Sequence, residues 1–171
     1  MIIGVDPGIS GALAVLYPDH GADLFDMPVS AKTAGKGNQV SCQGLVQLLD
    51  NWECEDVFCA FIERVNAMPP KMTGGKQRSA GATGMFGFGR SAGVIEMLFA
   101  ANGIRYEFVL PQHWKKHFGL TGKDKDASRT LAMELFPAVA GKLSRKKDVG
   151  RADALLIAEY GRLKIQQELI S

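Results

Sequence analysis

The chain has 171 residues, about the size of one domain and too short for two full lobes, and its composition (46% hydrophobic, 22% charged) excludes a disordered chain and a collagen. The net charge of +2 is unevenly distributed, because residues 1–60 carry eight acidic and two basic side chains whereas residues 111–151 carry four acidic and ten basic ones. A basic second half favours a polyanionic partner, although runs of charge are most often solvated surface.

The N-terminal part of the chain predicts an antiparallel meander followed by a helix. Short apolar segments are separated by turn residues, of which Asp6-Pro7-Gly8 is the first group, and tight turns between consecutive strands favour antiparallel pairing. A segment rich in Gly, Lys and Ser without periodicity then predicts a loop, after which Ser41 is the expected cap of a helix. The expected strands are residues 2–6, 12–17 and 22–27, the loop is residues 30–40, and the helix carries Leu45, Leu48 and Leu49.

The remainder of the chain alternates between strands and helices. Residues 57–62 are a continuous apolar run, typical of a strand buried on both faces. Residues 66–84 are rich in Gly, Pro and basic side chains and predict a long functional loop. The later elements are a helix over 85–102, a strand over 104–110, a short helical turn over 111–118, a helix over 126–136, and a last helix that begins between residues 148 and 152 and ends near residue 168.

The expected element order is therefore β-β-β-α-β-α-β-α-α. A meander followed by βα units predicts an α/β fold, with a mixed sheet (an antiparallel meander plus parallel strands) and helices on both faces. Neither an internal repeat nor a linker is visible, so we expect a single domain over residues 1–171.

Four carboxylates stand where a sheet and a helix would aim them at a common point. Asp6 and Glu63 end two expected strands, and ligand sites of open α/β sheets lie beyond such ends. Asp148 and Asp153 flank the start of the last helix. An unpaired buried carboxylate is costly, and a hard cation such as Mg²⁺ would offset both that cost and the mutual repulsion of the group. The pattern favours a metal site, and two such ions about 4 Å apart can activate a water and stabilise the leaving oxygen of a phosphodiester.

Each carboxylate has a plainer interpretation when it is taken alone. The four together, in this order and on these elements, favour the metal site over those interpretations. The alternatives are a turn role for Asp6, a salt bridge from Glu63 to Arg64 or another base, an N-cap role for Asp148, and a surface pair of Asp153 with Arg151 or Lys147.

An ordered set of short motifs resembles the RuvC-type Holliday junction resolvases of the RNase H-like superfamily. The resemblance is strongest to the phage, bacterial and chloroplast branch of that family and spans nearly the whole chain. The motifs are Ile3-Gly4-Val5-Asp6-Pro7-Gly8, Phe61-Ile62-Glu63, Trp114-Lys115-Lys116, residues 123–129, Leu135-Phe136-Pro137, Lys146-Lys147-Asp148, and residues 150–158 beginning Gly150-Arg151-Ala152-Asp153.

The resemblance implies an RNase H-like fold, a homodimer, and paired symmetric nicks in a four-way DNA junction that leave 5′-phosphate ends. It implies Mg²⁺, with Mn²⁺ as a substitute and two ions per active site. Asp6, Glu63, Asp148 and Asp153 would be the catalytic metal ligands, and Lys123 or Lys125 would match a lysine near the phosphates.

The sequence departs from the family pattern at two places. Typical bacterial resolvases place their two C-terminal acids three residues apart, whereas Asp148 and Asp153 are five apart and Gly150 occupies the position of the first acid. The wider spacing is normal in the branch with Lys-Lys-Asp. An aromatic wedge is expected three residues after Glu63, where this chain has Asn66. Substitutes for the wedge are Met68, Met85, Phe86 and Phe88.

Basic and aromatic residues along the second half predict a nucleic-acid surface. Three other patterns are weaker. Residues 87–92 fit a dinucleotide fingerprint without the preceding strand, His113 and His117 lack the glutamate of a zinc motif, and Trp114 is better explained as an anchor of its turn than as a stacking platform. The predicted DNA-binding residues are Lys71, Lys76, Arg78, Phe86, Lys115, Lys116, Lys123, Lys125, Lys146, Lys147 and Arg151.

The sequence thus predicts a metal-dependent, structure-selective endonuclease acting on branched DNA. The alternatives are another RNase H-like nuclease acting on branched DNA or RNA, and a non-catalytic junction-binding protein. No apolar run reaches the roughly 18 residues of a membrane span, no basic segment precedes the apolar start, and three cysteines form no disulfide framework. We therefore expect a bacterial or phage protein of the cytoplasm, with no membrane partner.

Overall fold

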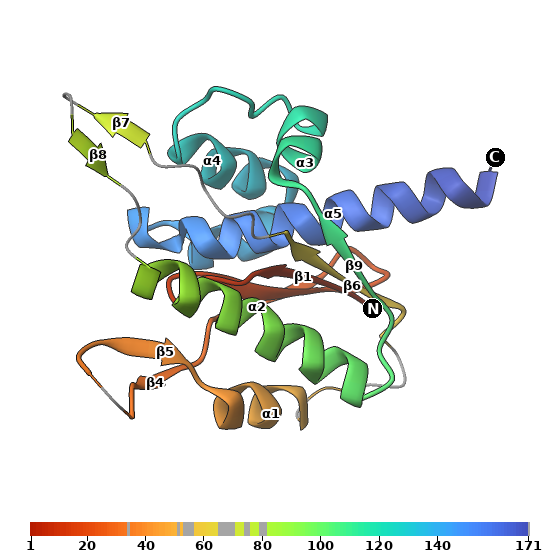
Figure 1. Ribbon diagram of the computed structural model, residues 1–171. Coiled ribbons are helices and arrows are strands. Elements are labelled where there is room, and N and C mark those ends of the chain that lie inside the picture. Colours follow the sequence, from red (N-terminus) through yellow and green to blue (C-terminus); the bar gives the residue numbers. More distant parts are fainter. Residues whose placement is uncertain are drawn as a thin grey trace.

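The structure, a computed structural model, describes residues 1–33, 35–50, 52, 57–64, 71–73, 76–78 and 82–170; for residues 71–73, 76–78, 82 and 83 it describes the backbone alone. A five-stranded mixed sheet lies at its centre, in the order β3-β2-β1-β6-β9 (Figure 1). Its strands are β1 (Ile2–Asp6), β2 (Ala12–Leu16), β3 (Ala22–Asp26), β6 (Cys59–Glu63) and β9 (Tyr106–Val109).

The predicted meander is confirmed, and so is the mixed α/β fold. Strands β1, β2 and β3 pair antiparallel in sequence order, with Ile2 opposite Leu16 at one end of the first pair. Strands β6 and β9 add to the other edge of β1 in parallel, and Val5 lies opposite Ile62. The apolar run predicted over 57–62 is β6, which is shifted toward Glu63 and buried along most of its length.

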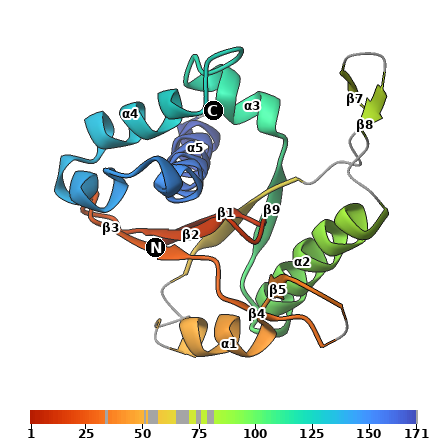
Figure 2. The same cartoon turned by 90° about the vertical axis from the view of Figure 1, so that its left-hand side faces the viewer.

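Helices cover both faces of the sheet (Figure 2). On one face, α1 (Cys42–Asp50) and α2 (Ala82–Ala101) enclose a core with the side chains of β1, β2 and β6 that point toward them. On the other face lie α3 (Pro111–His117), α4 (Asp126–Leu135), the 3-10 helices η2 (Pro137–Leu143) and η3 (Lys146–Asp148), and α5 (Val149–Ile170).

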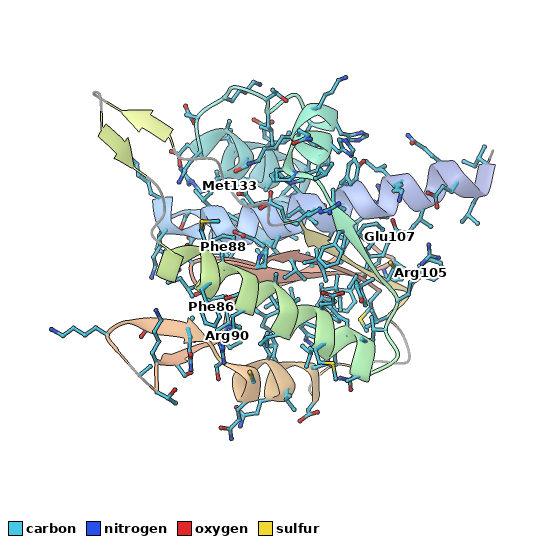
Figure 3. The ribbon with its side chains drawn as sticks, viewed as in Figure 1. Phe86, Phe88, Arg90, Arg105, Glu107 and Met133 are labelled. Atoms are coloured by element: carbon cyan, nitrogen blue, oxygen red, sulfur yellow. The ribbon has the colours of Figure 1, made fainter. Side chains whose placement is uncertain are left out.

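Helix α5 lies unusually close to the sheet because glycines face it. A Cβ atom at Gly4 would overlap the carbonyl oxygen of Ala154, and one at Gly161 would overlap the ring of Phe61. Alanine and glycine at these contacts let the helix axis approach the strands. At its far end the helix is tied to β9 by an ion pair between Lys164 and Glu107. Figure 3 labels Glu107 on β9. The depth of α5 on the sheet is what places its first turns beside the ends of β1 and β6.

Two segments predicted as loops contain short hairpins, so those predictions were wrong. Strands β4 (Val29–Ala31) and β5 (Asn38–Val40) pair within the predicted loop 30–40. Strands β7 (Lys71–Thr73) and β8 (Lys76–Arg78) pair within the predicted loop 66–84, whose last residues already belong to α2. Strands of three residues carry too little alternation to be recognised.

None of the helices in the described part of the chain is long and apolar enough to cross a membrane.

Local sequence features mark the starts of two helices. The Ser41 hydroxyl accepts a hydrogen bond from the backbone N–H of Gly44 at 3.1 Å, which confirms it as the cap of α1. Pro111 stands at the first turn of α3, where its missing N–H costs nothing.

Candidate carboxylate and lysine site

The ends of two neighbouring parallel strands place Asp6 and Glu63 on the same side of the sheet. Side chains alternate along a strand, and Val5 and Ile62 both point into the core under α1 and α2. Asp6 and Glu63, one residue further along β1 and β6, therefore face the layer of α3, α4 and α5. Asp153 comes from the first turns of α5, above them.

The turn between β1 and β2 brings the three carboxylates together. The backbone N–H of Gly11 donates to the carbonyl of Gly8 at 2.9 Å, and a Cβ at Gly11 would overlap the backbone of Asp6. On the helix side, a Cβ at Gly150 would lie 2.6 Å from the carbonyl oxygen of Ser10. The tight contact between this turn and the start of α5 therefore requires a glycine in both segments, Gly11 in the turn and Gly150 in the helix.

Burial and neighbouring charges raise the proton affinity of these carboxylates. Burial, followed by the charges of Glu63 and Asp153, raises the pKa of Asp6 to about 7. Burial is the main cause that raises the pKa of Glu63, with a further contribution from the charge of Asp153, and burial also raises the pKa of Asp153. Desolvation and like charges disfavour the ionised form, whereas a bound cation would favour it.

Trp114 and Lys115 from α3 complete the surroundings of Glu63. The buried indole of Trp114 donates its Nε1–H to Glu63 Oε1 at 3.0 Å. The Nζ of Lys115 stands 5.0 Å from the centre of the same indole ring, and its charge lowers the pKa of all three carboxyl groups. The prediction of Trp114 as an anchor is confirmed by its burial, but no sequence pattern indicated its hydrogen bond to Glu63.

Asp6 and Asp153 open into a cleft of about 360 Å³ whose rim is basic. Ser10 and Gly150 belong to its wall, as do Asp124 and Ser128 near the start of α4. Such a cleft concentrates positive potential directly around buried carboxylates, which is what a phosphate-bearing ligand and a bound cation require together. The lysines of the rim are Lys115, Lys123, Lys125, Lys146 and Lys147, all of them predicted from the sequence.

The donor set fits a hard divalent cation. Asp153 Oδ1 is buried without a hydrogen-bond partner, and an orphaned carboxylate oxygen is costly unless it binds a cation. Among the described residues, no group of three or more His, Cys, Asp or Glu side chains is arranged so that it could hold a metal ion by itself. Mg²⁺ commonly keeps several waters and takes only one or two carboxylates together with substrate phosphates, so an open arrangement suits it.

Asp148 is placed differently from the other three predicted ligands. It is 2% exposed, and both of its oxygens accept hydrogen bonds from Arg145, at 2.9 Å from the backbone N–H and at 2.9 to 3.2 Å from the guanidinium. These bonds hold the pKa of Asp148 below its usual value. It is absent from the cleft wall, and in this structure it closes the turn that leads into α5.

The other predicted DNA-binding residues lie in several places. Lys116 is exposed on α3 outside the cleft wall, and Arg151 forms a two-point ion pair with Asp26, at 2.6 and 2.8 Å. Phe86 is exposed near the start of α2. The side chains of Lys71, Lys76 and Arg78, and the positions of Asn66 and Met68, lie outside the described residues.

Three polar residues of the cleft wall were not predicted as site residues, namely Ser10, Asp124 and Ser128. Asp124 accepts the backbone N–H groups of Asp126 and Ala127 at 2.8 and 3.0 Å and so caps α4. Ser128, one turn into α4, lowers the pKa of Asp153 through its hydroxyl. The pattern of an acid two residues before a helix start could have revealed Asp124, but nothing local points from Ser128 to Asp153.

The order and pairing of the strands, with helices on both faces, form the fold of RuvC, an RNase H-like fold, and acids stand at the ends of β1 and β6. The chain is similar to Thermus thermophilus RuvC solved in complex with Holliday junction substrate, with a TM-score of 0.54 and 13% identity over 95% of each chain. A second structure of Thermus thermophilus RuvC aligns with a TM-score of 0.49 and 14% identity, over 95% of this chain and 96% of that one.

A sequence match supplies a more particular relative. Over 50 residues the chain is 54% identical to the chloroplastic Holliday junction resolvase MOC1 of Chlamydomonas reinhardtii. The match spans 29% of this chain and 6% of that protein. No family model matches the chain. The resemblance to RuvC-type resolvases, first seen in the motifs, is thus confirmed in the fold and in one segment of sequence.

Proposed function

We propose that this protein is a divalent-cation-dependent endonuclease that cuts branched DNA at four-way junctions. The observation that carries the proposal is the orphaned oxygen of Asp153 beside Asp6, under a rim of lysines, on a RuvC-type fold. The names of the similar proteins, one solved with a Holliday junction and one a junction resolvase, support the choice of substrate.

Asp6, Glu63 and Asp153 are the residues that would hold the cation. When bound, Mg²⁺ or Mn²⁺, as one ion or two, supplies charge stabilisation for a phosphodiester and an activated water at neutral pH. Trp114 is a positioning residue, because its hydrogen bond fixes the orientation of the Glu63 carboxylate. Asp148 positions the start of α5 through Arg145, which departs from its prediction as a ligand.

The lysines of the cleft would bind the phosphates on either side of the cut. The charge of Lys115 acts on all three carboxylates, and Lys123, Lys125, Lys146 and Lys147 extend the rim. Phosphate contacts of this kind orient DNA without reading its sequence. Lys116 would extend this surface, and Arg151 would act through the ion pair that ties α5 to Asp26. Lys71, Lys76 and Arg78 remain predicted contacts.

Paired symmetric cuts require two active sites, so the proposal includes a homodimer, with water attack leaving 5′-phosphate ends. The test uses a labelled four-way junction and a linear duplex of the same sequence, each with Mg²⁺ and with EDTA. We expect nicks that a ligase can seal on the junction alone, lost in EDTA and in Asp6→Asn. Junction binding without cutting would favour a binding protein, and equal cutting of RNA or linear DNA would contradict the choice of substrate.

A further inference from the structure

The lysines of the cleft rim come largely from two segments that are separate in the chain. Lys123 and Lys125 precede α4, whereas Lys146 and Lys147 belong to η3. Positive charges repel each other, so the two groups would move apart unless the backbone holds them. Figure 2 shows the chain between α4 and α5, which contains η3, folded back beside α4. The contacts that hold this connection against α4 therefore set the distance between the two groups of lysines.

Arg129 joins the two segments by hydrogen bonds. It stands one turn into α4, and its side chain is only 13% exposed. Its Nη1 donates to the carbonyl oxygens of Leu143 and Ser144, at 3.0 and 3.1 Å. These residues end η2, and the last carbonyl groups of a helix lack partners within it, so a cation there is favourable. The bonds fasten the residues immediately before η3 to α4.

The guanidinium of Arg129 is oriented from its other side by Asp126. Nε and Nη2 of Arg129 donate to the two oxygens of Asp126, both at 3.1 Å. Asp126 is the first residue of α4, directly after Lys125. The hydrogen bonds and charge of Arg129, together with the charge of Lys146, lower the pKa of Asp126. An arginine suits this position because its planar fork can bind a carboxylate and two carbonyls at once, whereas the ammonium of lysine is a single point.

The turn that carries Lys146 and Lys147 is closed by its own hydrogen bonds. The backbone N–H of Arg145 donates to Asp148 Oδ2 at 2.9 Å, and the backbone N–H of Asp148 donates to the carbonyl of Arg145 at 2.9 Å. Because this turn follows Ser144 directly, the contact between Ser144 and Arg129 sets where the turn stands relative to α4. The side chain of Leu143 is fully buried, so loss of the Arg129 contacts should loosen the turn without unfolding the protein.

We propose that Arg129 is a positioning residue for DNA binding, which fixes the spacing between the lysines before α4 and the lysines of η3 so that both groups bind phosphates of the same DNA together. The inference rests on the proposed function and deepens it, because it identifies what gives the rim its shape. Several weak contacts made together bind far more tightly than the same contacts made singly, provided that their spacing is fixed in advance. Arg129 therefore contributes to DNA affinity through the lysines.

The first test measures the affinity for a four-way junction over a range of salt concentrations, in the Asp153→Asn background, which should not cut. Arg129→Lys keeps the charge but cannot bind Asp126 and both carbonyls at once. We expect affinity to fall about ten-fold, and the slope of log affinity against log salt to fall by about two, because the η3 lysines lose their phosphates. Adding Lys146→Ala to this variant should cost no further affinity. An unchanged slope would overturn the proposal.

Arg162 provides the matched control. Its guanidinium binds Glu159, three residues before it on α5, at 2.6 and 2.7 Å, and its side chain is 19% exposed. The pair has the same spacing and order as Asp126 and Arg129 but lies toward the far end of α5. Arg162→Lys should lower Tm as Arg129→Lys does and leave the salt slope unchanged. Equal losses of slope in the two variants would overturn the proposal, because stability alone would then explain both.

The second test follows the turn itself, with neither DNA nor metal present. The backbone N–H groups of Arg145 and Asp148 are hydrogen-bonded within the turn, so their hydrogen exchange reports how well it is held. We expect faster exchange at both positions in Arg129→Lys and wild-type exchange in Arg162→Lys. Equal protection in the wild type and Arg129→Lys would overturn the proposal, because the turn would then keep its place without Arg129.

Further outcomes separate this inference from the proposed function. Arg129→Gln, which is shorter and neutral, is the second variant, and failure of both variants to fold would overturn the proposal in favour of a role in the core. If the wild type cuts the junction and both Arg129 variants bind it as the wild type does, the positioning role alone fails. If the wild type neither binds nor cuts the junction, the proposed function fails, and the role of Arg129 fails with it.

Discussion

The cleft at Asp6 and the groove at Phe86 lie on either side of one short turn and differ in almost every physical respect. The cleft is lined by charges whose positions are set by glycine contacts between α5 and the sheet. The groove, an open hollow between the β4–β5 hairpin and the start of α2, is mostly apolar and is lined by the exposed rings of Phe86 and Phe88. The cleft offers fixed charges for the reacting phosphate, whereas the groove offers an apolar surface.

The contrast teaches how a single fold separates reaction from recognition. Carboxylates that must share a cation need positions held to a fraction of an ångström, and a helix packed on a sheet supplies that. An apolar surface tolerates small shifts, because apolar contact is not directional. Substitutions should therefore divide into those that stop cutting and those that change where or how tightly the protein binds.

The largest effect is expected for Asp153→Asn. The amide of asparagine lacks the negative charge of Asp153, whose Oδ1 has no hydrogen-bond partner in the protein. The rate of cutting should therefore fall on the order of 10³-fold, equivalent to several kcal/mol of lost stabilisation of the transition state. Junction binding, measured by fluorescence anisotropy, should persist. Phe86→Ala is the opposite control, because it should weaken junction binding while cutting continues at saturating protein. An equal loss of junction binding in the two variants would contradict the separation of cutting from binding.

A smaller loss is expected for Trp114→Phe, which keeps the aromatic volume and deletes the hydrogen bond to Glu63. Outer contacts that orient metal ligands are typically worth 10- to 100-fold in activity or metal affinity. Cutting should be restored in part at high Mn²⁺ if the defect lies in cation binding. A variant that unfolds at a lower temperature but cuts normally at low temperature would show that Trp114 serves packing alone.

A modest, salt-dependent effect is expected for Lys125→Ala at the rim of the cleft. Loss of one phosphate contact should lower the slope of log affinity against log salt by about one, with little change in base preference. Lys164, at the other end of α5 and paired with Glu107, is the matched control. Equal slopes for Lys125→Ala and wild type would remove this lysine from the DNA surface.

The smallest effect on cutting is expected for Asp148→Asn. Loss of the ion pair with Arg145 should lower Tm by about 2–4 °C and leave most of the activity. Arg145 lowers the pKa of Asp148 in the folded protein. The ion pair therefore stabilises the fold fully at pH values above the ordinary pKa of an aspartate, about 3.9. This stabilisation is lost as the pH falls through the lowered pKa that Asp148 has in the folded protein.

The Tm difference between wild type and Asp148→Asn should therefore disappear at acidic pH, where Asp148 becomes protonated. A loss of cutting comparable to that of Asp153→Asn would instead restore Asp148 to the metal ligands.

The sequence predicted the fold and most of the cleft because those features depend on local patterns. Apolar runs bounded by Gly and Pro marked the strands, and their ends marked Asp6 and Glu63. The basic segment from Lys115 to Lys147 was visible as composition. Each of these features can be seen in a window of a few residues, which is where sequence periodicity carries information.

Contacts between segments that are far apart in the sequence could not be predicted from such short windows. The hydrogen bond from Trp114 to Glu63 joins α3 to β6, and the bond from Arg90 to Val40 holds a hairpin that has almost no pattern of its own. Asp148 is a different case, because the Lys-Lys-Asp motif before the last helix predicted a ligand, whereas in this structure Asp148 is paired with Arg145, three residues away. Partner choice depends on packing, which a spacing rule does not contain.

The contact between Gly150 and the β1–β2 turn couples two parts of the chain that are far apart in the sequence. Even a methyl group on Gly150 would lie 2.6 Å from the Ser10 carbonyl oxygen. Any side chain at this position, an acid included, therefore requires a differently shaped turn at residues 8–11. Placing an acid at position 150 of this protein should succeed only when the turn is exchanged with it, so the two segments have to be designed together.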